Sequence, residues 1–177
     1  MLNVKNLVSL SLGTLAAISG LGSLSTLAIA NPQIEIAAAR TQRVRVFFPK
    51  NPEQQNDLSY VAPVWRQTQN SGVAQFAIAQ VIAGPTRQEQ RLGFLAPIRL
   101  RGTSNCGQDF TLSITSNVAN VRFCKQVVSA GVGDDARILS SINKTLKQFP
   151  SIKSVVVLDQ KGKCFGDMSG ENRCLRR

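Results

Sequence analysis

Four cysteines are the most reactive side chains in this sequence, and histidine is absent. The lack of histidine excludes a Ser-His-Asp triad, a Cys-His dyad and any zinc site with a histidine ligand. A site with four cysteine ligands usually contains close Cys-x-x-Cys pairs, and these cysteines are spaced much more widely, so zinc is the weaker alternative. In an oxidising compartment an even number of cysteines favours disulfides, and pairing of neighbours in the sequence predicts the bonds Cys106–Cys124 and Cys164–Cys174.

The acidic residues show no spacing typical of acid and base catalysis or of cation binding. Asp134 and Asp135 are adjacent and point in different directions on a helix, so we interpret them as the acidic start of one. Residues 164–174 contain carboxylate and amide oxygens, but they lack the alternation of an EF-hand loop, so a disulfide-closed turn is favoured over a calcium site. A hydrolase would have to bring together in space acidic residues from the set Glu53, Asp57, Glu89, Asp109, Asp159 and Asp167. We therefore predict no catalytic residue, no metal site and no cofactor.

The first thirty residues have the layout of a secretory signal peptide. One cation is followed by the uncharged, mostly apolar residues 7–30, and Ala28 and Ala30 place small side chains before a cut after Ala30. An uncleaved membrane anchor is the alternative, because this stretch is long enough to span a bilayer, although serine, glycine and threonine dilute it. We expect residues 1–30 to be cleaved, with export to the periplasm or the extracellular space. The mature chain then has no stable membrane span and starts with a leader at residues 31–41.

Length and charge describe one basic domain. The chain has 177 residues, 21 lysines and arginines against 10 aspartates and glutamates, and a formal net charge of +11. Such a charge favours an anionic cell-wall polymer, an anionic lipid surface or an acidic protein as partner, with salt-sensitive binding. The alternative is that scattered cations only keep an exported domain soluble. Nucleic acid is disfavoured, because export separates the protein from it and most phenylalanines fall at positions expected in the core.

Hydrophobic periodicity predicts both strands and helices. The expected strands are residues 43–48, 58–66 (an edge strand or bulge because of Pro63), 98–101, 110–115 with a hairpin partner that starts at 121, and 152–158 as a central strand. The expected helices are residues 73–83 and 134–149. The residues expected to face the core are Phe110, Leu112 and Ile114 on the hairpin strand, and Leu139, Ile142, Leu146 and Phe149 on the second helix.

Residues 84–94 form a corner with strong local signals. A glycine suited to the left-handed helix cap and a proline that cannot continue a helix end the first helix. Thr86 and Glu89 then fit a capping box, in which the Thr86 hydroxyl accepts from the Glu89 amide and the Glu89 carboxylate reaches back. A second glycine ends the short helix that follows and turns the next phenylalanine inward. Capping and packing explain these residues without a ligand. The motif residues are Gly84, Pro85, Thr86, Glu89, Gly93 and Phe94.

Three stretches together resemble the GerMN domain family, also called the sporulation and spore germination GerM domain. They are RVRVFFP at residues 43–49, the motif within residues 84–94, and INKTLKQFP at residues 142–150 ahead of a valine-rich strand. The resemblance covers residues 42–160, and residues 161–177 form a disulfide-stapled tail beyond it. It implies an α+β fold with two main helices packed on one face of a mixed or antiparallel β-sheet, similar to the ring-building motifs of envelope channel complexes. It also implies a place in the cell envelope without catalysis.

We therefore expect a non-catalytic exported protein whose GerMN-like domain docks onto an envelope protein assembly or an anionic cell-wall polymer, through strand edges or its basic face. The alternative from another class is a hydrolase, or the accessory subunit of one, that acts on peptidoglycan. A third alternative is a disulfide-bonded inhibitor of exported enzymes, which would present an exposed rigid loop at residues 102–107.

Overall fold

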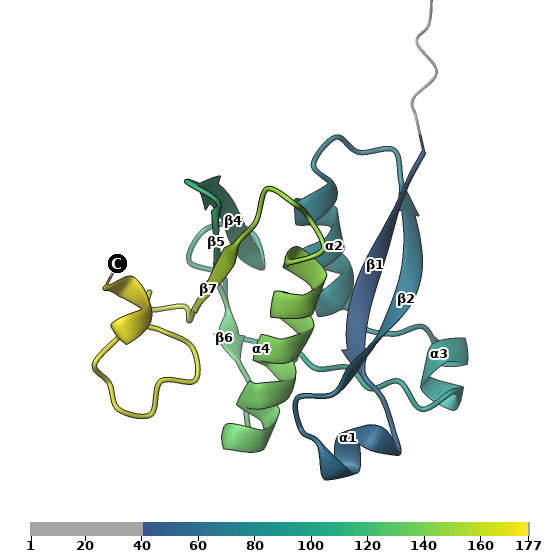
Figure 1. The fold of residues 1–177 in the computed structure, drawn as a ribbon. Coiled ribbons are helices and arrows are strands. Elements are labelled where there is room, and N and C mark those ends of the chain that lie inside the picture. The colour runs from purple at the N-terminus through teal and green to yellow at the C-terminus, as the bar shows by residue number, and fades with distance from the viewer. Residues whose placement is uncertain (1–40, 177) are drawn as a thin grey trace, which may run out of the picture. The chain divides into compact units, whose positions relative to one another are not determined.

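The computed structural model describes residues 41–176, so the expected signal peptide and nearly all of the expected leader lie outside the described residues. Strands and helices are interspersed along this part of the chain (Figure 1). Among these residues, no helix has the length and apolar character needed to cross a membrane. The elements are β1 (Gln42–Pro49), α1 (Glu53–Asn56), β2 (Val61–Thr68), α2 (Val73–Ala83), α3 (Arg87–Arg91), β3 (Leu100–Arg101), β4 (Phe110–Thr115), β5 (Val118–Phe123), β6 (Gln126–Val127), α4 (Val132–Leu146), β7 (Ser154–Leu158) and a C-terminal 3-10 turn (Arg173–Leu175).

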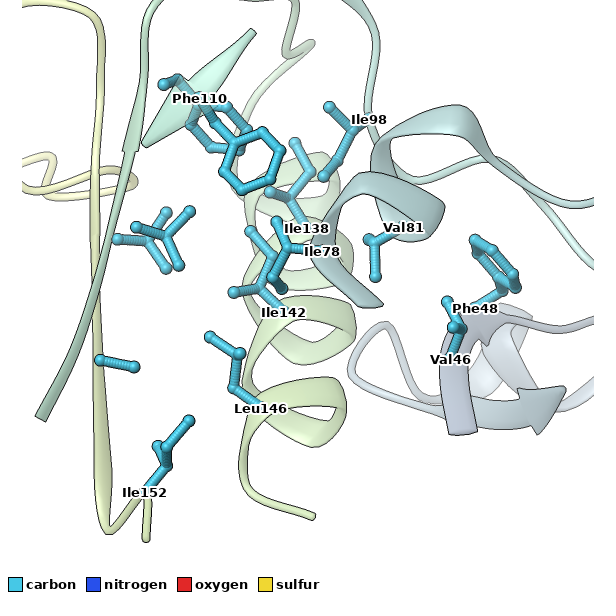
Figure 2. Close-up of a cluster of buried hydrophobic side chains, with 14 of the residues drawn as sticks. Val46, Phe48, Ile78, Val81, Ile98, Phe110, Ile138, Ile142, Leu146 and Ile152 are labelled. Atoms are coloured by element: carbon cyan, nitrogen blue, oxygen red, sulfur yellow. The ribbon is translucent and has the colours of Figure 1, made fainter. Parts of the chain in front are cut away.

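The expected α+β class, with mixed and antiparallel strand pairing, is confirmed. The strands are divided among three small sheets: the antiparallel pair β1–β2, the antiparallel pair β3–β6, and β4–β5–β7, in which β4 is antiparallel and β7 parallel to β5. Both main helices contact β1, and α4 also contacts β7, so α4 lies between the first hairpin and the three-stranded sheet. The apolar faces of hairpin, helices and sheet meet in one hydrophobic core (Figure 2).

Strand β1 forms where alternation predicts it. Val44, Val46 and Phe48 are buried, because every second side chain of a strand points to the same face. The edge of β1 that does not pair with β2 is covered by side chains of α4 and the residues after it. The Arg45 amide donates to Gln148 Oε1 at 3.0 Å, and the Phe47 amide donates to Thr145 Oγ1 at 3.1 Å. A helix thus satisfies amides that would otherwise face solvent at a sheet edge.

The β4–β5 hairpin is tighter than expected. Its turn consists of Ser116 and Asn117, which both have positive φ, and β5 begins at once with Val118 instead of near residue 121. The prediction that Ile114 faces the core is wrong, because its side chain is 45% exposed. It lies on the same face of the sheet as buried Phe110, but so near the hairpin tip that the strand has passed the end of the core.

Helix α4 buries a slightly different stripe from the expected one. Ile138, Ile142 and Leu146 are fully buried, whereas Leu139 and Phe149 pack only at the margin of the core. Strand β7 is an edge strand and not the expected central one. The last residues of its outer edge are nevertheless covered, because the C-terminal tail pairs with Val157 and Leu158. The neighbouring residues Val156 and Val157 point to opposite faces of the sheet and are both buried, which explains why the sequence of β7 is nearly continuously apolar.

Both predicted disulfides are present. Cys106–Cys124 joins the loop before β4 to the end of β5, with Cα atoms 5.6 Å apart. Cys164–Cys174 closes the tail, with Cα atoms 6.0 Å apart. The tail begins by pairing with β7, since the Phe165 amide donates to the Val157 carbonyl at 2.9 Å. The second disulfide therefore holds a segment that covers a sheet edge.

Candidate functional site

The corner at residues 84–94 has the geometry that its sequence predicts. The Glu89 amide donates to Thr86 Oγ1 at 3.3 Å, and the Thr86 amide donates to Glu89 Oε2 at 2.8 Å, which completes the capping box at the start of α3. Gly84 and Gly93 both have positive φ, and a Cβ at Gly93 would lie 3.0 Å from the Asn51 carbonyl oxygen. Phe94 is turned inward and buried. The motif is therefore built for backbone geometry and packing.

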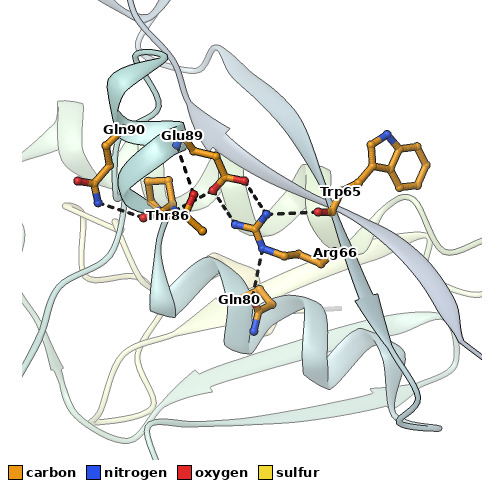
Figure 3. A network of polar contacts seen from close by, with 7 residues as sticks. Trp65, Arg66, Gln80, Thr86, Glu89 and Gln90 are labelled. Atoms are coloured by element: carbon orange, nitrogen blue, oxygen red, sulfur yellow. Dashed lines mark hydrogen bonds and ion pairs between the residues drawn. The ribbon is translucent and has the colours of Figure 1, made fainter.

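Arg66 adds a partner that the motif does not reveal. Its guanidinium forms a bidentate ion pair with Glu89, at 2.6 Å to Oε1 and 2.7 Å to Oε2, and its Nε donates to Gln80 Oε1 at 3.3 Å (Figure 3). The side chains of Arg66 and Glu89 are only 14% and 17% exposed. The hydrogen bonds from Arg66 hold the pKa of the Glu89 carboxyl below its ordinary value. This cluster ties β2, α2 and α3 together, and its charges already have partners.

The outward face of the first hairpin, which we call the hairpin face, is accessible. It consists of Arg43, Arg45, Phe47, Pro63 and Trp65, which alternate with buried residues along β1 and β2. Trp65 is 56% exposed and points away from the Arg66 cluster (Figure 3). The Arg43 guanidinium lies 4.7 Å from the centre of the Trp65 ring, and the Arg45 guanidinium 5.7 Å from that of Phe47. The face therefore combines exposed aromatic surface with cations.

A groove of about 680 Å³ continues the hairpin face between β1 and α4. Among residues 41–176, its lining contains three cations, Arg45, Lys144 and Lys147, and no carboxylate. This arrangement favours anionic groups, because no acidic side chain in the groove neutralises the lysines and the arginine. The remaining lining residues are Phe47, Ser59, Leu139, Ser140, Asn143 and Gln148.

A second groove of about 680 Å³ lies beside the C-terminal tail and includes three aspartates. Their carboxylates already serve the local turns. Asp135 Oδ1 accepts from Ser129 Oγ at 2.7 Å, Asp159 Oδ1 accepts from the amides of residues 161 and 163, and Asp167 accepts from Ser169 and from the Asn172 amide. Within residues 41–176, no three cysteine or acidic side chains gather in a group that would hold a metal ion. We interpret this groove as part of the stapled tail.

Most of the carboxylates that could support hydrolysis have separate partners. Glu89 binds Arg66, and Asp109 forms an ion pair with Lys125 at 2.7 Å. Hydrogen bonds from Ser59 lower the pKa of Asp57, and the hydrogen bond from the Ala130 amide lowers that of Asp134. A general acid needs a raised pKa, so the lowered pKa values of Glu89, Asp57 and Asp134 work against that role for these three residues.

A family model described as Germane, sporulation and spore germination, matches residues 45–163. Among solved structures, the chain is similar to the tandem GerMN domains of the sporulation protein GerM from Bacillus subtilis, with 20% sequence identity and a TM-score of 0.46. The match covers 78% of this chain and 48% of that chain, so this chain spans about half the length of its match. No protein with a curated description matches.

Proposed function

Because the chain belongs to the Germane (GerMN) domain family, whose description is sporulation and spore germination, we propose that it is a non-catalytic, exported module of the cell envelope. It binds an anionic cell-wall polymer through the hairpin face and the adjoining groove. Export is supported by the signal-like N-terminus and by the use of all four cysteines in disulfides, which form in oxidising compartments.

The observation that carries this proposal is Trp65, which is largely exposed and lies beside cations for which residues 41–176 provide no carboxylate partner. A large exposed aromatic ring offers a flat apolar surface, and sugar rings present flat apolar faces of matching size. The cations add attraction for carboxylate or phosphate groups, which weakens as salt rises. Cell-wall polymers combine sugar rings with such anionic groups. The surface therefore matches their chemistry better than that of a purely ionic partner.

We expect Trp65→Ala to weaken binding to purified cell-wall sacculi about tenfold, or about 1.4 kcal/mol, because the aromatic contact is lost. Cosedimentation at low and high salt measures this, with release of soluble wall fragments assayed in the supernatant. The matched control is Leu92→Ala, which truncates an exposed apolar side chain on another surface. If Leu92→Ala weakens binding as much as Trp65→Ala, the hairpin face is not the binding site.

The charge contribution is tested separately. We expect the double variant Lys144→Gln with Lys147→Gln to weaken binding and flatten its salt dependence, whereas Lys161→Gln with Lys163→Gln changes both much less. All four lysines are exposed, and each double variant removes the same net charge. Equal losses of binding in the two double variants would mean that binding depends on the net charge of the protein and not on the groove. Lack of binding at both salt concentrations would indicate a protein partner, and release of wall fragments would overturn the non-catalytic assignment.

A further inference from the structure

The strand edges of the described domain are protected in different ways. The free edge of β1 is hydrogen-bonded by Thr145 and Gln148, and the free edge of β7 is covered by the tail at Phe165. Strand β2 contains Pro63, which has no amide hydrogen, and its Trp65 carbonyl accepts from the Arg66 guanidinium. Covering segments and proline are common means of preventing unwanted strand pairing. Within residues 41–176, the outer edge of β4 has none of these protections.

The hydrogen-bond pattern shows which amides of β4 point outward. The Cys124 amide donates to the Asp109 carbonyl at 2.8 Å, and the two-residue turn places Thr115 in a hydrogen-bonded pair with β5. Odd-numbered residues of this strand therefore bond to β5, and Phe110, Leu112 and Ile114 direct their N–H and C=O groups away from it. Within residues 41–176, no hydrogen-bond partner is found for the amides of Leu112 and Ile114.

The side chains make this edge suited to pairing. Strand β4 reads Phe-Thr-Leu-Ser-Ile-Thr, without a charge or a proline. Ile114 is 45% exposed on the face that is otherwise directed to the core. Charged or proline residues usually guard such an edge, and their absence leaves an uncharged strand free to add a neighbour.

We propose that β4 pairs antiparallel with β4 of a second copy of this chain, which joins the two three-stranded sheets into one of six strands. The outward amides are symmetric about Leu112, so a two-fold axis there places Phe110 of one copy opposite Ile114 of the other. Ile114 then gains an aromatic neighbour on the core face. Because β4 is uncharged, the pairing sets no like charges opposite one another, and the second copy supplies the apolar Phe110 that matches the exposed Ile114. This pairing does not depend on what the hairpin face binds.

The test uses the protein exported by a bacterial host, so that both disulfides form. Sedimentation equilibrium over a wide concentration range measures the monomer–dimer constant. We expect Ile114→Pro to weaken association at least about tenfold, because it removes an outward N–H from each copy while the β4–β5 hydrogen bonds remain. Ile114→Val is the matched control, since it keeps the amide and an apolar β-branched side chain. A monomer at millimolar concentration, or an equal effect of both substitutions, would overturn the proposal.

A second measurement on the unmodified chain guards against misfolding of the proline variant. Hydrogen exchange followed by NMR reports single amides, and we expect exchange at Leu112 and Ile114 to slow as the protein concentration rises. The amides of Thr111 and Ser113, which bond to β5, change much less. A dimer in which the Leu112 and Ile114 amides still exchange freely would mean that another surface makes the contact.

Discussion

Replacing Glu89 with alanine is expected to lower the free energy of unfolding by about 3 kcal/mol. The change removes a capping interaction worth about 1 kcal/mol and leaves the mostly buried Arg66 guanidinium without its bidentate partner. Urea denaturation of the two proteins measures the difference. Glu171→Ala is the matched control, because it breaks an ion pair with Arg173 whose side chains are 44% and 76% exposed. Such exposed pairs contribute at most about 1 kcal/mol. Similar losses in both variants would show that the Arg66–Glu89 pair is no more than a surface contact.

The same pair predicts an acid-sensitive part of the stability. Arg66 lowers the pKa of Glu89 in the folded state below the ordinary 4.5, so the folded state favours the carboxylate. This contribution is fully present above pH 4.5 and is lost as the pH falls through the lower pKa of the folded protein. We therefore expect the stability difference between the unmodified chain and Glu89→Gln to shrink on acidification from pH 7 to pH 3, as measured by urea midpoints. A stability difference that stays constant from pH 7 to pH 3 would contradict the stabilisation of the Glu89 carboxylate by Arg66.

Removal of the first disulfide, by Cys106→Ala with Cys124→Ala, is expected to cost about 3 kcal/mol. The two residues are 18 apart in sequence, and the chain-entropy model gives that magnitude for a loop of this size. Cys124 is also fully buried next to Phe123, so the substitution disturbs core packing as well. Thermal unfolding of oxidised, reduced and substituted protein measures the effect.

The tail disulfide provides the comparison for this experiment. Cys164→Ala with Cys174→Ala opens a shorter loop at the margin of the fold. We expect a smaller global loss together with faster hydrogen exchange at Phe165, whose amide bonds to β7. If the Cys106→Ala with Cys124→Ala variant proved the more stable of the two, the tail disulfide would contribute more to stability than Cys106–Cys124, which would contradict this expectation.

Local chemistry made much of this fold predictable. The capping box at Thr86 and Glu89, the helix ending at Gly84 and the alternation of β1 all depend on residues within a few positions of one another. The disulfide pairing was predictable because sequence neighbours among the cysteines are also spatial neighbours. The resemblance to the GerMN family, confirmed by the family match, supplied the overall class.

Long-range contacts were not predictable in this way. Nothing in the sequence near Arg66 indicates that it pairs with Glu89, 23 residues away, because an arginine on a strand is usually solvated. Trp65 lies on the exposed side of β2 only because the register with β1 turns Val64 inward. Ile114 has the parity of a core residue, and its exposure depends on where the core ends and not on the strand pattern. Trp65 and Ile114 lie on the hairpin face and at the edge of β4, so both proposals depend on positions that only the folded structure defines.

The contact between β1 and Gln148 joins residues that are 103 positions apart. A polypeptide is made from its N-terminus, so the first hairpin exists long before the segment that covers its edge has been synthesised. Until then the amides of Arg45 and Phe47 remain open to other strands. A nascent chain stopped short of Thr145 is therefore exposed to wrong pairing at its N-terminal end, and synthesis of Thr145 and Gln148 ends that exposure.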